Sequence, residues 1–345
     1  MSADAGSATT ERLPTEGQSP ERRGRISPAK VLERFGLVAA WIVVIAVFGA
    51  LRPDTFMTSA NFSTILGSQA VLVVLTLGLT LALTTGDYDL SIGGTLSLSA
   101  MLIAVLNAKH GWPLGAAIAA ALAAGAAVGA VNGMFVLVFG VDSFIVTLGT
   151  GTVLQGVVLW ISDSTTISGV SDTLVNAVVG TSVLGIPIAF YYGLALCFVL
   201  WYVFEYTALG RRMLFVGRGR RVSRLSGIDV TRVRWGALVA TGVISAFAGV
   251  LYAGTTGGAD STSGASFLLP AFAAAFLGAT TIVPGRFNPW GTIVAVYFLV
   301  TGITGLTILG VQSYVQQLFY GGALVLAVAL SQWPRRKEHR DAEAA

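Results

Sequence analysis

The sequence predicts an all-α protein, a polytopic α-helical membrane bundle of about ten transmembrane segments with cytoplasmic N- and C-termini. Three observations support this prediction. Of the 345 residues, 54% are hydrophobic and only 11% are charged, whereas soluble domains carry about 25% charged residues. The apolar residues form ten runs close to the roughly 20 residues that cross a bilayer as a helix. The basic residues gather in three clusters instead of being spread along the chain.

The three basic clusters set the topology. Of the 21 Lys and Arg residues, six precede Phe35, eight lie in residues 207–234 and four follow Trp333. An arginine at the bilayer centre costs about 2.5–3.5 kcal/mol on insertion scales, and basic loops stay on the cytoplasmic side. Six spans from a cytoplasmic N-terminus return the chain to the cytoplasm at 207–234, and four more return it at 334–345. All three clusters then share one side, which supports an even number of spans.

The chain divides into a membrane domain between two tails. Residues 1–34, rich in Ser, Pro, Glu and Arg, are expected to form a disordered cytoplasmic tail. Residues 35–333 form the membrane domain, and residues 334–345 form a second cytoplasmic tail. Within the membrane domain the predicted spans, of which the eighth is the shortest, are Phe35–Leu51, Gln69–Thr84, Leu90–Leu106, Leu114–Phe139, Phe144–Ile161, Ile186–Tyr206, Trp235–Tyr252, Phe267–Val283, Trp290–Leu309 and Tyr314–Trp333.

Small residues recur on one face of the fourth span. Gly125, Gly129 and Gly133 are four residues apart, a spacing that lets helix backbones approach closely in a membrane. We expect this face to pack inside the bundle, with a dimer face as the alternative. Residues 162–185 form the longest predicted outside loop, either a surface for an extracytoplasmic partner or a solvated connector. The single cysteine, Cys197, lies inside an apolar run and is expected to be a packed thiol.

The sequence lacks the motifs of an ATPase, a metalloenzyme or a hydrolase. None of the three lysines follows the Gly-rich pattern of a phosphate-binding loop. The two histidines lie in a loop and a tail, so no usual metal cluster is expected. The predicted spans hold almost no ionisable residue, which disfavours an ion-coupled carrier. We therefore expect no enzyme activity, no cofactor and no bound metal, and the net charge of +4 needs no nucleic acid to explain it.

The sharpest local motif interrupts the chain between the second and third spans, at Thr85–Gly94. Asp89 precedes an apolar run and is expected to cap the next helix through the amide of Ser91 or Ile92. Broken helices in membrane proteins line cavities rather than lipid. Two interpretations stay open: a capped helix start with a structural role, or a segment of a substrate path.

The basic loop 207–234 contains a second motif. Residues Arg220–Ser226 place Val222 and Leu225 on one side of a two-turn amphipathic helix. Gly227 is positioned to end this helix, and Asp229 to cap the following one. The pattern alone fits a basic segment on the membrane surface as well as a docking helix for a cytosolic partner.

Several motifs in order resemble the permease subunits of bacterial ABC sugar importers, the ribose, xylose, rhamnose and autoinducer group. These motifs are Thr85–Gly93 (TGDYDLSIG, near the family's GGIDLSVG), Val131–Gly133, Ser143–Gly149, Thr207–Arg211, Arg224–Ile228, Ala246–Gly249 and Gly278–Gly291. Each motif alone is weak, but the ordered set covers roughly residues 60–330 and is specific.

The resemblance implies a multi-pass subunit of the bacterial cytoplasmic (inner) membrane that imports a monosaccharide by alternating access. It implies three protein partners: a cytosolic ATP-binding subunit, a second permease subunit in a homo- or heterodimer, and an extracytoplasmic sugar-binding protein. Membrane lipid surrounds the complex. Permeases for branched-chain amino acids or nucleosides share this plan and remain the alternative, and an ion-coupled secondary transporter is a more distant one.

The resemblance also assigns roles to residues. It maps the basic loop 207–234 onto the family's coupling loop, which favours docking over membrane attachment. The predicted ATPase-coupling residues are Arg218, Arg220, Arg221, Ser223, Arg224, Leu225, Gly227 and Ile228. The predicted translocation-path residues are Asp87, Asp89, Ser91, Asn132, Phe144 and Thr147. This chain has Gly217-Arg218-Gly219-Arg220-Arg221 where the family has Gly-Gly-Asn-Glu-Glu, so the docking socket on its partner is expected to be unusually acidic.

Overall fold

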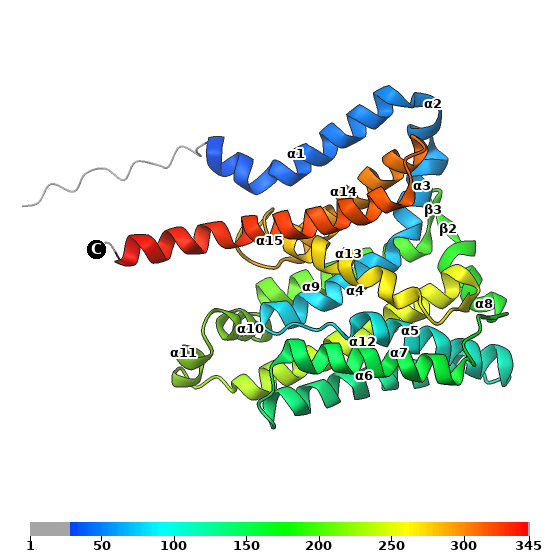
Figure 1. Cartoon of the computed structure of the whole chain (residues 1–345), viewed down its shortest axis with the longest axis horizontal. Coiled ribbons are helices and arrows are strands. Elements are labelled where there is room, and N and C mark those ends of the chain that lie inside the picture. The colour runs from blue at the N-terminus through cyan, green and yellow to red at the C-terminus, as the bar shows by residue number, and fades with distance from the viewer. Residues whose placement is uncertain (1–27, 344–345) are drawn as a thin grey trace, which may run out of the picture.

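The computed structural model describes residues 28–343, with side chains from residue 34 to residue 329. The described chain is a bundle of helices that run roughly side by side (Figure 1). The first half contains α1 (Pro28–Leu51), α2 (Pro53–Phe56), α3 (Ser59–Ser68), α4 (Ala70–Thr84), α5 (Ile92–Ile103), the π-helix η1 (Ala104–Lys109), α6 (Leu114–Leu137), α7 (Ser143–Ile161), α8 (Asp172–Val175) and the π-helix η2 (Asn176–Gly180). The second half contains α9 (Ile188–Tyr206), α10 (Ala208–Arg218), α11 (Arg220–Leu225), α12 (Val230–Thr256), α13 (Ser263–Gly278), α14 (Pro289–Ile308) and α15 (Ser313–Glu343).

Each of the ten predicted spans coincides with a helix or a continuous helix pair, which confirms the all-α membrane bundle. Eight helical segments are long and apolar enough to cross a membrane, and two shorter apolar helices, Ser263–Gly278 and Ser313–Ala329, complete the set of ten. The eighth span is α13, whose 16 residues rise about 24 Å, less than the roughly 30 Å hydrocarbon core. The predicted span Phe267–Val283 therefore ends too late, because α13 stops at Gly278 and residues 279–283 belong to an irregular segment that reaches residue 288.

The N-terminal boundary differs from the expectation. Helix α1 begins at Pro28, so residues 28–34, expected as part of the disordered tail, are helical. Proline is favoured in the first turn of a helix because its fixed φ angle is already helical and the missing N–H has no intrahelical partner there. Residues 1–27 of the expected tail lie outside the described residues. At the other terminus, α15 continues past residue 333 to Glu343, so residues 334–343 extend the last helix.

The two ends of the bundle carry different elements. Figure 1 shows α10, α11, the start of α1 and the C-terminal end of α15 at one end, and α2, α8, β2 and β3 at the opposite end. The basic loop 207–234 therefore lies at the same end as the described parts of the other two clusters, Lys30 and Arg34 at the start of α1 and residues 335–340 of α15, as the predicted topology requires. We call the end with α10 and α11 the inner end and the opposite end the outer end.

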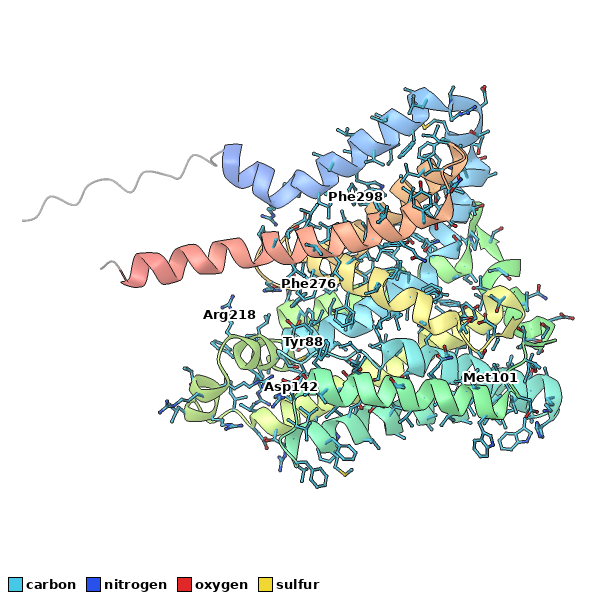
Figure 2. The ribbon with its side chains drawn as sticks, viewed as in Figure 1. Tyr88, Met101, Asp142, Arg218, Phe276 and Phe298 are labelled. Atoms are coloured by element: carbon cyan, nitrogen blue, oxygen red, sulfur yellow. The ribbon has the colours of Figure 1, made fainter. Side chains whose placement is uncertain are left out.

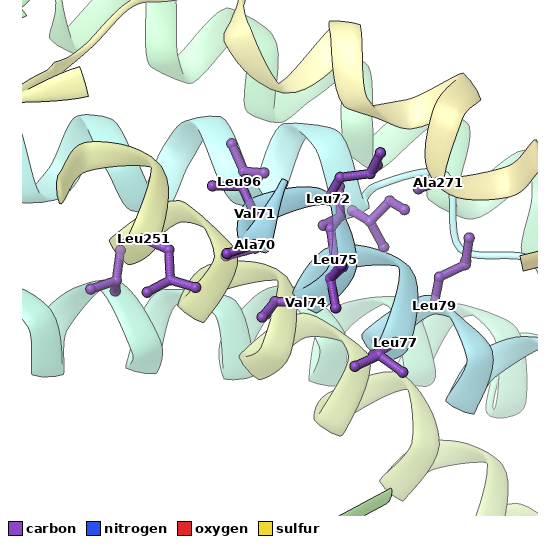
Figure 3. Close-up of a cluster of buried hydrophobic side chains, with 14 of the residues drawn as sticks. Ala70, Val71, Leu72, Val74, Leu75, Leu77, Leu79, Leu96, Leu251 and Ala271 are labelled. Atoms are coloured by element: carbon purple, nitrogen blue, oxygen red, sulfur yellow. The ribbon is translucent and has the colours of Figure 1, made fainter. Parts of the chain in front are cut away.

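Helix α4 forms the centre of the core. All of its 15 residues are buried, which is expected of a helix that is apolar on every face. Figure 3 shows its leucines and valines near Leu96 of α5, Leu251 of α12 and Ala271 of α13. The helix ends at Thr84, so the segment that follows it starts inside the protein rather than in lipid.

Helices α6 and α12 pack with their backbones in near contact, through the glycines of the fourth predicted span. A Cβ atom on Gly125 would lie 2.5 Å from the carbonyl oxygen of Gly242, and one on Gly129 would lie 2.4 Å from that of Leu238. The third glycine, Gly133, faces the Trp235 ring in the same way. These contacts confirm internal packing as the role of this face.

The outer end is tied together by two short antiparallel strand pairs. Strand β1 (Ile167–Ser168) pairs with β4 (Gly258–Ala259), and β2 (Ser182–Val183) pairs with β3 (Ile186–Pro187). The β1–β4 pair joins the long loop 162–187 to the connection between α12 and α13. The loop is therefore a structured cap, built from short strands and helices, and it is anchored on the outer end of α12.

An aspartate fixes the turn that follows β4. Asp260 accepts hydrogen bonds from the hydroxyls of Tyr252, Ser263 and Thr262 and from the Thr262 amide. Burial alone raises the pKa of the Asp260 carboxyl, but these hydrogen bonds outweigh it and lower the pKa to about 2. The carboxylate thus stays ionised at the start of α13, where its charge suits the positive end of the helix dipole.

Candidate functional site

The polypeptide between α4 and α5, residues 85–91, forms a non-helical segment that we call the break. The break begins with Gly86, whose φ of +79° favours glycine because a Cβ atom is strained there. Two side chains of α7 then satisfy its backbone. Ser143 Oγ accepts from the Tyr88 amide (3.1 Å), and Thr147 Oγ1 accepts from the Leu90 amide (2.9 Å). The Thr147 hydroxyl has two carbonyl acceptors within reach, Ser143 of its own helix at 2.8 Å and Tyr88 of the break at 3.1 Å.

A hydrogen-bonded chain of three buried side chains follows. Asp89 Oδ1 accepts from the Ser91 amide at 3.0 Å and from the Ser91 hydroxyl at 2.6 Å. Asn132 of α6 donates from Nδ2 to Ser91 Oγ at 2.9 Å. The predicted contact of Asp89 with the Ser91 amide is present, but the N-cap position of α5 is Ser91 itself and has no side-chain cap, so Asp89 fixes the turn just before the helix instead of capping it. Burial raises the pKa of the Asp89 carboxyl to about 6, against the hydrogen bonds from Ser91, which lower it.

The charge of the break is carried by Asp87, a carboxylate that is only 1% exposed. Arg234, in the first turns of α12, donates from Nε to Asp87 Oδ2 at 2.8 Å and from Nη2 to Oδ1 at 2.5 Å. Arg220, the first residue of α11, donates from Nη2 to Asp87 Oδ1 at 3.0 Å and to the Gly86 carbonyl at 2.8 Å. A buried charge needs a partner with good geometry, and here two arginines of the basic loop supply it.

The basic loop itself forms a projecting element at the inner end. Helix α10 begins at Thr207, whose Oγ1 accepts from the Gly210 amide at 3.2 Å. Helix α11 ends before Gly227, which has a φ of +77°, and Asp229 Oδ1 accepts from the Arg232 amide at 3.0 Å at the start of α12. The predicted two-turn helix, its glycine stop and the aspartate cap are all confirmed.

The exposed surface of α11 combines apolar and basic side chains. Val222 is 66% exposed and Leu225 is 83% exposed. Arg221 and Arg224 of the same helix are also exposed, and the described residues offer neither of them an ion-pair partner. Two exposed apolar side chains between unpaired arginines form a surface suited to a partner that is apolar at its centre and acidic at its rim.

Two hollows border the break at the inner end. A cavity of about 220 Å³ lies between the break, α10 and the 279–288 segment, and Tyr88, Phe276, Arg218 and Arg286 are among its lining residues. Figure 2 shows Tyr88, Arg218 and Asp142 at the inner end, with Met101 far from them. A second, more open cleft of about 430 Å³ lies between the break, α11 and the turn from α6 to α7.

The structure brings together five of the six predicted path residues around the break, and it places the sixth elsewhere. Asp87, Asp89, Ser91, Asn132 and Thr147 are all buried and take part in the contacts given above, whereas Phe144 is 48% exposed. Their role in a translocation path stays a prediction, since contacts of this kind also serve to position the break.

The predicted coupling residues divide into two groups. Arg218, Arg221, Arg224, Leu225 and Gly227 are exposed, whereas Arg220 and Ile228 are half-buried and Ser223 is 2% exposed. Arg234, the closest partner of Asp87, is absent from the predicted site residues. An arginine immediately before a span, combined with an acid in another break, is a signal that points to such a pair. Val222, the second exposed apolar residue of α11, was also left out of the predicted set.

Comparisons with known proteins place this geometry in context. The family model described as "branched-chain amino acid transport system / permease component" matches residues 61–328. The D-allose transport system permease protein of Escherichia coli is 32% identical over 87% of this chain and 92% of its own length. The ribose import permease protein of Bacillus subtilis is 33% identical over 94% of this chain and 98% of its own. The autoinducer 2 import system permease protein of Photorhabdus laumondii is 30% identical over 85% and 89%, respectively. No solved structure matches the chain significantly.

Proposed function

From the premise that this chain belongs to the branched-chain amino acid transport system / permease component family, we propose that it is the transmembrane permease subunit of an ATP-binding cassette sugar importer. A separate ATP-binding subunit drives alternating access, and the chain conducts a monosaccharide across the cytoplasmic membrane. The relatives favour a sugar over a branched-chain amino acid, because two of them are named for D-allose and ribose. The eight span-length apolar helical segments and the two shorter ones among the described residues fit a multi-pass protein of the inner membrane.

The observation that carries this proposal is the docking surface of α11. The helix projects from the inner end with Leu225 83% and Val222 66% exposed, between arginines that have no ion-pair partner among the described residues. Neighbouring apolar side chains that are exposed beyond the membrane-spanning helices and rimmed by polar groups are typical of a protein–protein interaction surface. A cytosolic ATP-binding subunit with an apolar socket and an acidic rim would cover both kinds of side chain.

The remaining partners follow from the outer end and from the family. The structured cap of loop 162–187 offers a surface to an extracytoplasmic sugar-binding protein, which would deliver the solute and set much of its specificity. A second permease subunit, identical or related, would complete the pathway between two bundles. In this proposal the buried residues around the break, among them Asp87, Asp89 and Asn132, hold the inner end of the pathway, and Phe144 faces the second subunit or lipid.

The chain supplies no ATPase chemistry of its own in this proposal. Its role is to convert movement of α11 into a conformational change of the helix bundle. The described spans favour the ion-coupled alternative less, because Asp87 and Glu205 lie at helix ends and are paired with arginines, and the buried Asp89 is held by two hydrogen bonds from Ser91.

The experiment uses the chain co-expressed with its ATP-binding subunit and its binding protein, reconstituted in proteoliposomes. The triple variant Arg221→Asp/Arg224→Asp/Leu225→Asp is expected to insert normally but to lose association with the ATP-binding subunit and uptake of labelled sugar. A matched variant, Arg211→Asp/Arg212→Asp, reverses two charges on α10 and is expected to keep association.

The outcomes separate the possibilities. Unchanged uptake and association in the triple variant would refute docking through α11. Equal losses in both variants would mean that overall positive charge, and not the α11 surface, holds the partner. Uphill uptake by the purified chain alone, driven by an ion gradient, would refute the ATP-driven function itself.

A further inference from the structure

The Asp87 carboxylate at the break has two arginine partners, although one arginine would balance its single negative charge. Arg234 makes two hydrogen bonds that span both oxygens of Asp87, and its side chain is 10% exposed. A bidentate arginine of this kind is the strong form of a carboxylate pair. Arg234 alone therefore neutralises Asp87, and the second arginine, Arg220, is not required to keep that charge buried.

Arg220 is held in a different way from Arg234. It contacts Asp87 through one nitrogen, Nη2, and its side chain is 41% exposed. Ion pairs with an exposed partner contribute little to stability because water and salt screen them. Since Arg220 is also the first residue of α11, its contacts with Asp87 and with the Gly86 carbonyl join the docking helix to the break by a weak and reversible link.

A cleft that can bind a second acidic side chain lies beside this contact. The 430 Å³ cleft between α11, the break and the α6–α7 turn is lined by Arg220, Arg224 and Arg234, and by Asp87 and Asp142. The lining thus has one more cation than anion. Both carboxylates of the cleft have other partners: Asp87 binds two arginines, and Asp142 accepts a hydrogen bond from the Phe144 amide at 2.9 Å. Arg224 therefore forms no ion pair with a carboxylate among the described residues. The cleft borders the exposed surface of α11.

We propose that Arg220 is a positioning residue that exchanges carboxylates: it binds Asp87 in the state described here and binds an acidic side chain of the ATP-binding subunit when that side chain enters the cleft. The inference rests on the proposed function and goes beyond docking. It assigns to Arg220 the step that frees the break from α11 while Arg234 keeps Asp87 neutralised. The partner contributes a carboxylate, which Arg224 helps to attract.

The first test measures coupling in the reconstituted complex with its ATP-binding subunit and binding protein. Arg220→Gln is expected to assemble normally, because the α11 surface is intact, but to transport about fivefold less sugar per ATP hydrolysed, the lower end of typical coupling effects. Arg220→Lys is expected to restore coupling, because one nitrogen with several donors reproduces both contacts that Nη2 makes. The matched control, Arg232→Gln, removes one exposed charge of the same loop and is expected to stay within about twofold of wild type.

The second test detects the exchange directly. The amine of the Arg220→Lys variant allows carbodiimide to form an amide with an adjacent carboxylate, in a chain with only three native lysines. Mass spectrometry of the complex is expected to find a link to Asp87 without nucleotide and a link to the ATP-binding subunit with a non-hydrolysable ATP analogue.

Three results would overturn the exchange. The first is wild-type coupling in Arg220→Gln, the second is loss of assembly in that variant, which would make Arg220 a plain docking residue, and the third is a link to Asp87 alone in both nucleotide states. None of them touches the proposed function, which is judged in the same vesicles by whether the wild-type complex takes up sugar with ATP.

Discussion

Replacing Gly217 by alanine is expected to push α10 away from the break and to impair transport. Gly217 is the second-to-last residue of α10, and a Cβ atom on it would lie 1.9 Å from the carbonyl oxygen of Thr84, the last residue of α4. An ordinary contact of this kind begins at 3.4 Å, so the two backbones must separate by about 1.5 Å. The obstacle is a backbone atom and not the end of a flexible side chain.

The size of the effect follows from that separation. Overpacking of this kind costs about 1–3 kcal/mol. A shift of 1.5 Å at Gly217 also carries Arg220, three residues along, beyond the 2.7–3.2 Å range of the hydrogen bonds that it makes with the break. We therefore expect lower thermal stability of the detergent-purified chain and weaker sugar uptake by the reconstituted complex.

Gly219→Ala is the matched control. A Cβ atom on Gly219 would meet only the Val222 side chain, at 3.8 Å, and its φ of −173° is open to any residue. The two variants differ by two positions and have the same change in mass, so uptake and melting temperature compare directly. If Gly217→Ala behaves like Gly219→Ala in both assays, the contact between α10 and α4 has no part in transport and the reasoning is refuted.

Three further predictions concern the rest of the bundle. Gly129→Ala is expected to destabilise the chain by about 1–3 kcal/mol. The control Gly115→Ala on the same helix is expected to be neutral or stabilising, because its Cβ atom would meet nothing within 4 Å. Equal melting temperatures of the two variants would contradict the close α6–α12 packing. A cysteine at Leu184, which is 93% exposed, is expected to react with an impermeant maleimide added outside intact cells, whereas a cysteine at Leu225 is expected to react only after lysis. The native cysteine is buried and gives a low background. The reverse labelling pattern would invert the topology. Because the pKa of Asp260 is lowered to about 2 from the usual 3.8, its ionised form is favoured by folding, and its contribution is complete above pH of about 4 and lost towards pH 2. Asp260→Asn replaces a charged acceptor of several hydrogen bonds by a neutral amide and is thus expected to reduce stability by about 1 kcal/mol, equally at pH 5 and pH 8, and a difference between these two pH values would count against the lowered pKa.

Local signals in the sequence were sufficient for the helices and their ends. Hydrophobic runs predict the ten spans because the bilayer sets their length. Gly227 and Asp229 end α11 and begin α12 through contacts within a few residues, so their roles are visible in the sequence. The start of α1 at Pro28 was missed, since the polar composition of the tail outweighed the proline signal.

Local signals in the sequence could not identify the partners of Asp87. Arg220 and Arg234 are 133 and 147 residues away in the chain, and only the folded bundle brings them to the break. The resemblance placed Arg220 among the coupling residues, but a short helix in the sequence does not reveal that this side chain also reaches the break. The same limit explains why Ser143 was missed: its hydroxyl accepts from the backbone of the break, which lies far from it in the sequence.

Helix α12 connects the two sides of the membrane as a single rigid rod. Its 27 residues measure about 40 Å. At its outer end, β4 ties the rod to the cap that faces the exterior, and near its inner end Arg234 holds Asp87. A tilt of about 5° moves one end of such a rod by about 3.5 Å relative to the other, more than the tolerance of a hydrogen bond. A force that a solute-loaded binding protein applies to the outer cap would therefore displace the inner end of α12 directly, without a flexible linkage between the two ends.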